Sequence, residues 1–213
     1  MGIAINGSGT VSGIAVGGLP DGIIQTADMA SGVLYQPTGS LRVLERFYSP
    51  CDGSVMPTSK GNVTLGNVTA FQDLTTTVTQ ITGSSITYEP PAGTVQIIYE
   101  FVFFTAFYNA NPIATMHLYL DGVEVTSAIR GYGGEDTEDN FNFKWGFNIG
   151  GTANAATGRV ASWSGTKTIE LKIRDWLSNA NQGYIHTTQY TDGVNTNTFV
   201  MPCIGITAIG TDS

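Results

Sequence analysis

The densest cluster of ionisable side chains is an acidic run that follows a tyrosine: Tyr132, Glu135, Asp136, Glu138 and Asp139. Oxygen-rich loops of this kind bind calcium, but the spacing departs from the Asp-x-Asp-x-Asp-Gly pattern that directs several ligands to one ion. We therefore favour a solvated loop over a calcium site, and we predict no metal ion here.

The two cysteines and two histidines show none of the paired spacings of a zinc site. Cys51 and Cys203 lie at opposite ends of the main domain, where a sandwich can bring its first and last strands together. A disulfide is therefore possible in principle. Because residues 1–10 have no basic region and no apolar block, we expect no secretion signal and favour two free thiols. His117 and His186 each lie in a strand-like stretch and are expected to pack rather than bind metal.

Sequence motifs of catalysis are missing. The chain has no Gly-x-Ser-x-Gly elbow, Walker loop, His-Glu-x-x-His or Cys-x-x-Cys motif, and neither histidine has an evident nucleophile beside it. A pair of carboxylates could serve a glycosidase, but such enzymes usually need a larger fold or a deeper cleft. We therefore expect neither an enzyme nor a bound cofactor.

The charge pattern argues against two classes of partner. The net charge is -8 and only nine basic residues are present, scattered singly, whereas phosphate binding requires clustered Lys and Arg. The longest apolar run, Val95 to Tyr108, is interrupted by Gln96, Glu100 and Thr105, so it is too short for a spanning helix. We expect no nucleic acid partner, no membrane insertion, and synthesis in a cytoplasm.

The composition indicates an all-β fold, and its strands must position the acidic run, the cysteines and the histidines. Charged residues make up only 12% of the 213 residues, while 27 are Gly and the polar remainder is mostly Thr, Ser and Asn. Helices draw on Glu, Lys, Leu and Ala, whereas β-branched and hydroxyl residues suit pleated surfaces. About ten alternating runs separated by turn signals, among them residues 159–164 and 183–190, predict an antiparallel β-sandwich. Asp121-Gly122 is a strong hairpin signal.

The first part of the chain differs from the rest. Residues 1–39 are rich in Gly, have one aromatic residue and show no sustained period, so this segment cannot form a core of its own. We predict an extended N-terminal arm that packs on another surface, followed by a sandwich domain over residues 40–213. The alternative is a simple linker.

One predicted strand, Thr94 to Tyr108, is apolar on both faces. Its even positions include Ile98, Glu100, Val102 and Phe104. A lone antiparallel sandwich has one solvated face, so a strand that is apolar on both sides indicates cover by another chain. We predict self-association through these four residues, with Glu100 paired to a cation such as Arg130 or Arg174. The alternative is cover by the chain's own loops.

Several stretches resemble small virion proteins and fibre tips of tailed bacteriophages, especially those of cyanobacteria and other marine bacteria. They are INGSGTVSGIAVGGLPDGIIQTADMA, QPTGSLRVLERFYS, TQITGSSITYEPPAGTVQIIYEFVF and LYLDGVEV, about half of the chain together. The resemblance implies an N-terminal attachment arm and a trimeric jelly roll like those of tumour-necrosis-factor-like and complement-head-like domains. The closing strand, from Pro202 to Ile209, is similar to the last jelly-roll strand, which lies inside the trimer.

The resemblance also implies roles for particular residues. The arm would attach to the virion through Ile14, Val16, Leu19, Ile23 and Ile24. For adhesion, the acidic run with Tyr132 is the expected contact with a glycan or protein of the host surface, because its mixture of polar and aromatic residues suits sugar contacts. The expected function is therefore a homotrimeric, nonenzymatic virion protein, made in the bacterial cytoplasm and projecting outward for adhesion. Its partners would be itself, other capsid or tail proteins, and the host surface. The alternative is a decoration protein that stabilises the head.

Overall fold

The computed structural model of the chain describes residues 4–5, 11–12, 41–107, 113–133, 137–176 and 183–211. The chain divides into two units, Met1–Ser40 and Leu41–Ser213. In the first unit, β1 (Ala4–Ile5) pairs with β2 (Val11–Ser12) in an antiparallel hairpin. The five predicted attachment residues, Ile14, Val16, Leu19, Ile23 and Ile24, lie outside the described residues.

The second unit contains two main antiparallel sheets, and we call the first the β9 sheet. Its central order is β3-β18-β9-β13, while β15 pairs with the last three residues of β9 and β6 pairs with β15. The strands are β3 (Arg42–Pro50), β18 (Cys203–Gly210), β9 (Thr94–Phe107), β13 (Thr137–Asn148), β15 (Gly183–Ile185) and β6 (Gln72–Asp73).

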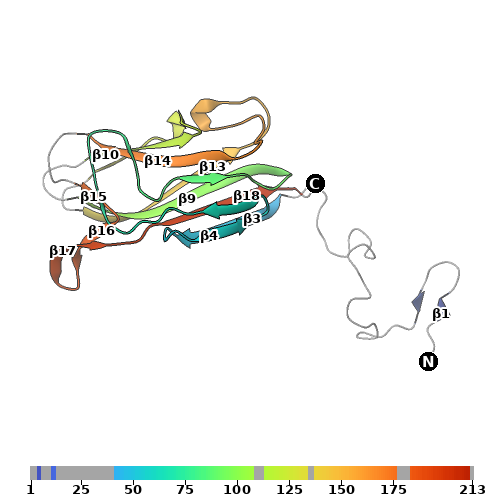
Figure 1. The fold of residues 1–213 in the computed structure, drawn as a ribbon. Coiled ribbons are helices and arrows are strands. Elements are labelled where there is room, and N and C mark those ends of the chain that lie inside the picture. Colours follow the sequence, from blue (N-terminus) through green and yellow to red (C-terminus); the bar gives the residue numbers. More distant parts are fainter. Residues whose placement is uncertain are drawn as a thin grey trace. The chain divides into compact units, whose positions relative to one another are not determined.

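The second sheet, which we call the β10 sheet, has the central order β8-β14-β10-β12. Its strands are β8 (Ile86–Tyr88), β14 (Lys167–Asp175), β10 (Ile113–Leu120), β12 (Arg130–Gly133), β11 (Val123–Glu124) and β7 (Thr79–Gln80). In Figure 1, β10 and β14 lie in one layer, and β9, β18 and β3 lie in the other. Two packed sheets with these four-stranded central orders form a jelly roll. The predicted antiparallel β-sandwich is confirmed.

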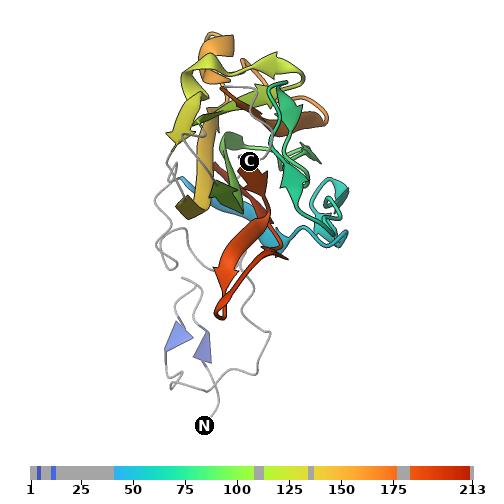
Figure 2. The same cartoon turned by 90° about the vertical axis from the view of Figure 1, so that its left-hand side faces the viewer.

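Smaller elements complete the second unit. Two hairpins are formed by β4 (Val55–Thr58) with β5 (Gly61–Thr64) and by β16 (Thr187–Thr191) with β17 (Val194–Phe199). Two short 3-10 turns, η2 (Thr126–Ala128) and η3 (Ala155–Thr157), lie side by side. Figures 1 and 2 both show η3, in orange, beside the yellow-green η2, and in Figure 1 both lie above the layer that holds β10 and β14.

The core lies between the sheets because each central strand alternates. On β9, the odd positions Ile97, Tyr99, Phe101 and Phe103 are fully or almost fully buried. On β10, Ala114, Met116, Leu118 and Leu120 point inward, and β14 adds Ile169, Leu171 and Ile173. Period-two alternation therefore places one side-chain row of each strand in the shared core.

The hairpin predicted at Asp121-Gly122 is present between β10 and β11. Both residues have positive φ angles, 50° for Asp121 and 75° for Gly122. A two-residue turn of this kind matches the twist of the strands that flank it. Asp121 Oδ1 also accepts a hydrogen bond of 2.8 Å from the backbone N–H of Thr168, which ties the turn to the start of β14.

The structure corrects several sequence-based expectations. The second half of the acidic run is not a loop, because Thr137–Asn140 belongs to β13 and pairs with the end of β9. The run predicted at residues 159–164 forms only isolated bridges. The run predicted at residues 183–190 is interrupted by His186, which is fully buried and has a φ of 64°. An L-residue with that backbone breaks the ladder, so β16 leaves the sheet there.

Both cysteines are free thiols; Cys51 is buried, whereas Cys203 is only partly buried. The Cys51 thiol is buried and points to Gly83 O at 3.5 Å, and burial raises its pKa to about 12. Within the described residues, no helix is long and apolar enough to span a membrane. The same residues contain no group of three or more His, Cys, Asp or Glu placed to hold a metal ion.

Candidate functional site

The outer face of the β9 sheet carries the four residues predicted to mediate self-association. Ile98, Glu100, Val102 and Phe104 alternate with the buried core positions, so they point away from the β10 sheet. Each remains partly exposed. The alternation therefore places three apolar side chains and one carboxylate in a single row along β9.

Neighbouring strands extend this row sideways. The register places Cys203 of β18 opposite Val102, and Asn142 of β13 on the other side of Val102. Two residues before Cys203, Met201 is 40% exposed, and Tyr48 of the edge strand β3 is 46% exposed. We call this surface the β9 outer face and define it by Tyr48, Ile98, Glu100, Val102, Phe104, Lys144, Met201 and Cys203.

The charge on the β9 outer face is compensated within the chain. Glu100 lies opposite Lys144 of β13, and the carboxylate oxygen is 3.2 Å from the Lys144 ammonium. The side chain of Asn142 donates a second hydrogen bond of 3.0 Å to the same oxygen. The sequence-based expectation that Glu100 pairs with Arg130 or Arg174 is therefore wrong. Within the chain, Arg130 stacks over Trp145, and Arg174 donates a hydrogen bond to the backbone carbonyl of Asp175.

The ring of Tyr48 packs over Gly205 on this surface. Gly205 lies opposite both Tyr48 and Glu100, and a side chain at Gly205 would come within 2.7 Å of the Tyr48 ring. Glycine therefore allows the ring to approach the sheet closely. Burial and the neighbouring Cys203 and Glu100 raise the pKa of Tyr48 to about 12, so its hydroxyl stays neutral at physiological pH.

One end of the sheet is covered by the hairpin of β16 and β17. The Glu138 carboxylate accepts hydrogen bonds from the hydroxyl of Thr188, at 2.9 Å, and from the backbone N–H of Gln189. Glu138 lies opposite Ala106, which is fully buried. Glu138 therefore positions the hairpin on the sheet, a role that the linear sequence does not reveal.

Of the other residues predicted to bind a receptor, the structure brings two together and does not describe two. Tyr132 of β12 donates a 2.6 Å hydrogen bond from its hydroxyl to Asp139 of β13, so these two are brought together. The Tyr132 ring also packs edge-on against Phe141. Asp139 raises the pKa of Tyr132, although burial contributes more. Glu135 and Asp136 lie outside the described residues.

Comparisons with known proteins give little that bears on function. No protein-family model matches the chain, and no curated protein matches it. A solved structure of infectious bursal disease virus, Gx strain, is similar at 12% sequence identity and a TM-score of 0.33. The match covers 82% of this chain and 42% of that chain, so this chain spans less than half the length of that one. A likeness at this level says nothing about function.

Only part of the β9 outer face could be predicted from the sequence, for a physical reason. The alternation along β9 identified Ile98, Glu100, Val102 and Phe104, because period two is visible within one strand. The contributions of Tyr48, Lys144 and Cys203 depend on which strands pair and in what register. Those strands are separated by tens of residues in the sequence, and no local signal specifies their pairing.

Proposed function

We propose that this chain is a homotrimeric structural protein of a tailed-bacteriophage virion, attached through its N-terminal arm and projecting its jelly roll for adhesion to the host surface. The observation that supports it is the β9 outer face, an apolar row on an outer sheet surface whose one carboxylate already has its cation. The phage assignment comes from the sequence resemblance.

The chemistry of the β9 outer face suits burial against identical copies. An apolar surface gains free energy when it leaves water, and an unpaired buried charge would oppose that gain. Lys144 and Asn142 neutralise and hydrogen-bond Glu100 before any partner arrives. A copy of the same chain therefore needs to supply no countercharge. Three copies would place Ile98, Val102 and Phe104 around a common axis.

The arm would provide the attachment in this proposal. Residues 14, 16, 19, 23 and 24 are aliphatic and occur in a glycine-rich segment with no Lys or Arg. Deleting residues 1–31 should leave a folded trimer that no longer enters virions, while the thermal midpoint barely changes. A truncated protein that fails to fold would show that these residues belong to the domain.

The alternative within the virion is a decoration protein on the head. Adhesion predicts that purified protein binds host cells and that Tyr132→Ala weakens this binding. Decoration predicts that the protein ignores cells, binds empty heads and raises their resistance to heat. Electron microscopy of virions labelled on this protein would place the label on the tail in the first case and on the head in the second.

A further inference from the structure

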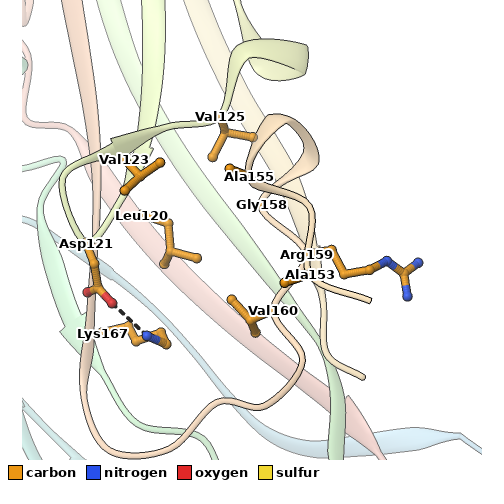
Figure 3. A pocket seen from close by; sticks show the side chains of 10 residues that line it. All are labelled: Leu120, Asp121, Val123, Val125, Ala153, Ala155, Gly158, Arg159, Val160 and Lys167. Atoms are coloured by element: carbon orange, nitrogen blue, oxygen red, sulfur yellow. Dashed lines mark hydrogen bonds and ion pairs between the residues drawn. The ribbon is translucent and has the colours of Figure 1, made fainter. Parts of the chain in front are cut away.

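The second unit has an aliphatic cavity where the β10-β11 hairpin meets the segment that connects β13 to β14. Its volume is about 240 Å³. Figure 3 shows Leu120 and Val123 on the hairpin side, facing Val160 across the cavity, with Ala155 of η3 at its rim. Val123 is 55% exposed and Val125 is almost fully buried, so the cavity runs from open surface to core. Its centre is lined by methyl groups.

A hydrogen-bonding pair lies along one edge of this cavity. Figure 3 shows Asp121 and Lys167 side by side, and the ammonium is 2.7 Å from Asp121 Oδ2. A carboxylate has about four acceptor positions and an ammonium has three donors. Asp121 uses one position for Lys167 and another for the Thr168 amide, and both side chains are partly exposed. Acceptor and donor positions therefore remain for a ligand.

The edge is charged but electrically balanced. Burial raises the pKa of Asp121, but hydrogen bonds from Lys167 and Thr168 outweigh it and hold the pKa below its usual value. Lys167 supplies the opposite charge. Arg159 also lines the cavity, but Figure 3 shows its guanidinium pointing away from the aliphatic centre, and it donates to Gly150 O at 3.1 Å. An uncharged ligand therefore fits this edge better than an anion.

We propose that this cavity binds an uncharged N-acetylated sugar unit, with its acetyl methyl among Leu120, Val123 and Val160 and its hydroxyls on Asp121 and Lys167. A sugar hydroxyl both donates and accepts, so adjacent hydroxyls match a carboxylate beside an ammonium. A methyl group matches the small aliphatic centre. This proposal rests on the adhesion function and adds a second recognition site to it, because Tyr132 lies beside Ala114 at the other end of β10.

The binding is tested by saturation-transfer NMR with millimolar N-acetylglucosamine and the intact chain. The acetyl methyl should receive the strongest saturation. Glucose, which has no acetyl group, should bind at least about fourfold more weakly, the effect expected from one buried methyl-sized group. Lys167→Met, which keeps the stem and removes the donors, should also weaken binding.

Two adjacent alanines of η3 provide a matched pair of variants. Ala155 lines the cavity and Ala156 does not, and both are exposed, so Leu at either position should leave the domain folded. Ala155→Leu fills the cavity and should reduce binding at least tenfold. Ala156→Leu should bind like the wild type. Equal thermal midpoints of the two variants would show that folding is unchanged.

The outcomes separate the cavity from the adhesion function. No saturation of the acetyl group by the wild type, or equal saturation with Ala155→Leu, overturns the cavity proposal. Host cells that bind the wild type and Ala155→Leu equally would leave adhesion intact while rejecting the cavity as its site. Sugar binding by a protein that ignores host cells would retain the cavity and reject adhesion.

Discussion

The two outer faces of the sandwich differ in how their side chains are satisfied. On the β10 sheet, polar groups pair with one another. His117 of β10 lies 2.6 Å from Glu124 of β11. On β14, Lys172 lies 3.0 Å from Glu170 of the same strand and also stacks over Tyr119 of β10. On the β9 outer face, one ion pair lies among Ile98, Val102 and Phe104. One fold therefore presents a surface suited to water and another suited to burial.

The difference arises from alternation in β9 and β10, which follow each other in the sequence and lie in different sheets. In β10, Ile113 is the one aliphatic outward position and the others are Thr115, His117 and Tyr119, whereas in β9 the outward positions are mainly aliphatic or aromatic. Both strands have equally apolar inward rows, so the core does not require the apolar outer row of β9. A row that the core does not require indicates a second contact surface.

Introducing a charge into the β9 outer face should have the largest effect. Val102→Asp would bury an unpaired carboxylate in the proposed trimer, at a cost of several kcal/mol per copy. Analytical ultracentrifugation should show loss of the trimer at micromolar concentration. Thr115→Asp, at an outward position of β10 beside Arg174, is the matched control and should leave the mass unchanged. Equal behaviour of the two variants would remove the distinction between the faces.

Truncating an inward ring of β9 should affect folding itself. Phe103 is 1% exposed, and Phe103→Ala should lower the free energy of unfolding by about 3–5 kcal/mol. Tyr119→Ala removes a ring from the outer face of β10 and should cost about 1 kcal/mol or less. Urea unfolding of both variants gives the difference. Similar losses would mean that Tyr119 is covered by more than Lys172.

His186 should make the end of the β9 sheet sensitive to acid. Its Nε2 lies 2.9 Å from Thr82 O, and burial lowers its pKa from 6.5 to about 4, although that hydrogen bond opposes the shift. Between these values the unfolded chain binds a proton that the folded chain does not. The free energy of unfolding should therefore fall by about 3 kcal/mol as pH drops from 6.5 to 4.

The variant His186→Asn checks this contribution. Asn tolerates a positive φ angle and does not titrate, so its unfolding free energy should lack this part of the pH dependence. Urea unfolding at a series of pH values measures the slope for both proteins. Identical slopes would show that other groups cause the acid sensitivity.

Removing surface cations should have the smallest effect and should still distinguish the faces. Lys172→Met should change the unfolding free energy by about 1 kcal/mol or less, because its ion pair with Glu170 is partly exposed and solvent-screened ion pairs contribute little. Lys144→Met should have an equally small effect on an isolated subunit, since Lys144 is 54% exposed. In the trimer it would leave Glu100 without its cation and raise the dissociation constant. Equal dissociation constants for Lys144→Met and Lys172→Met would contradict this account.

Local patterns in the sequence predicted the parts of the fold that local physics controls. The Asp121-Gly122 turn was predicted correctly because the two residues themselves favour positive φ angles. The alternation of buried and outward residues along β9 was predicted correctly because it is visible within one strand. The start of β13 was missed, since Glu138, Asp139 and Asn140 have little strand preference and adopt a strand by pairing with β9.

The sites that combine distant segments were not predictable in this way. Lys144 reaches Glu100 only because β13 pairs with β9 in one particular register. The aliphatic cavity joins residues near 120 with residues near 155 and 160, and neither stretch shows a binding motif. Pairing across more than thirty residues depends on the whole core and leaves no local signal.

The mass of the intact protein in solution tests the central claim most directly. Static light scattering at micromolar concentration should give about three times the chain mass of 22.5 kDa, because the β9 outer face is expected to be buried between copies. A single species of 22.5 kDa that persists at that concentration would contradict the account of this face and the trimer proposed from it.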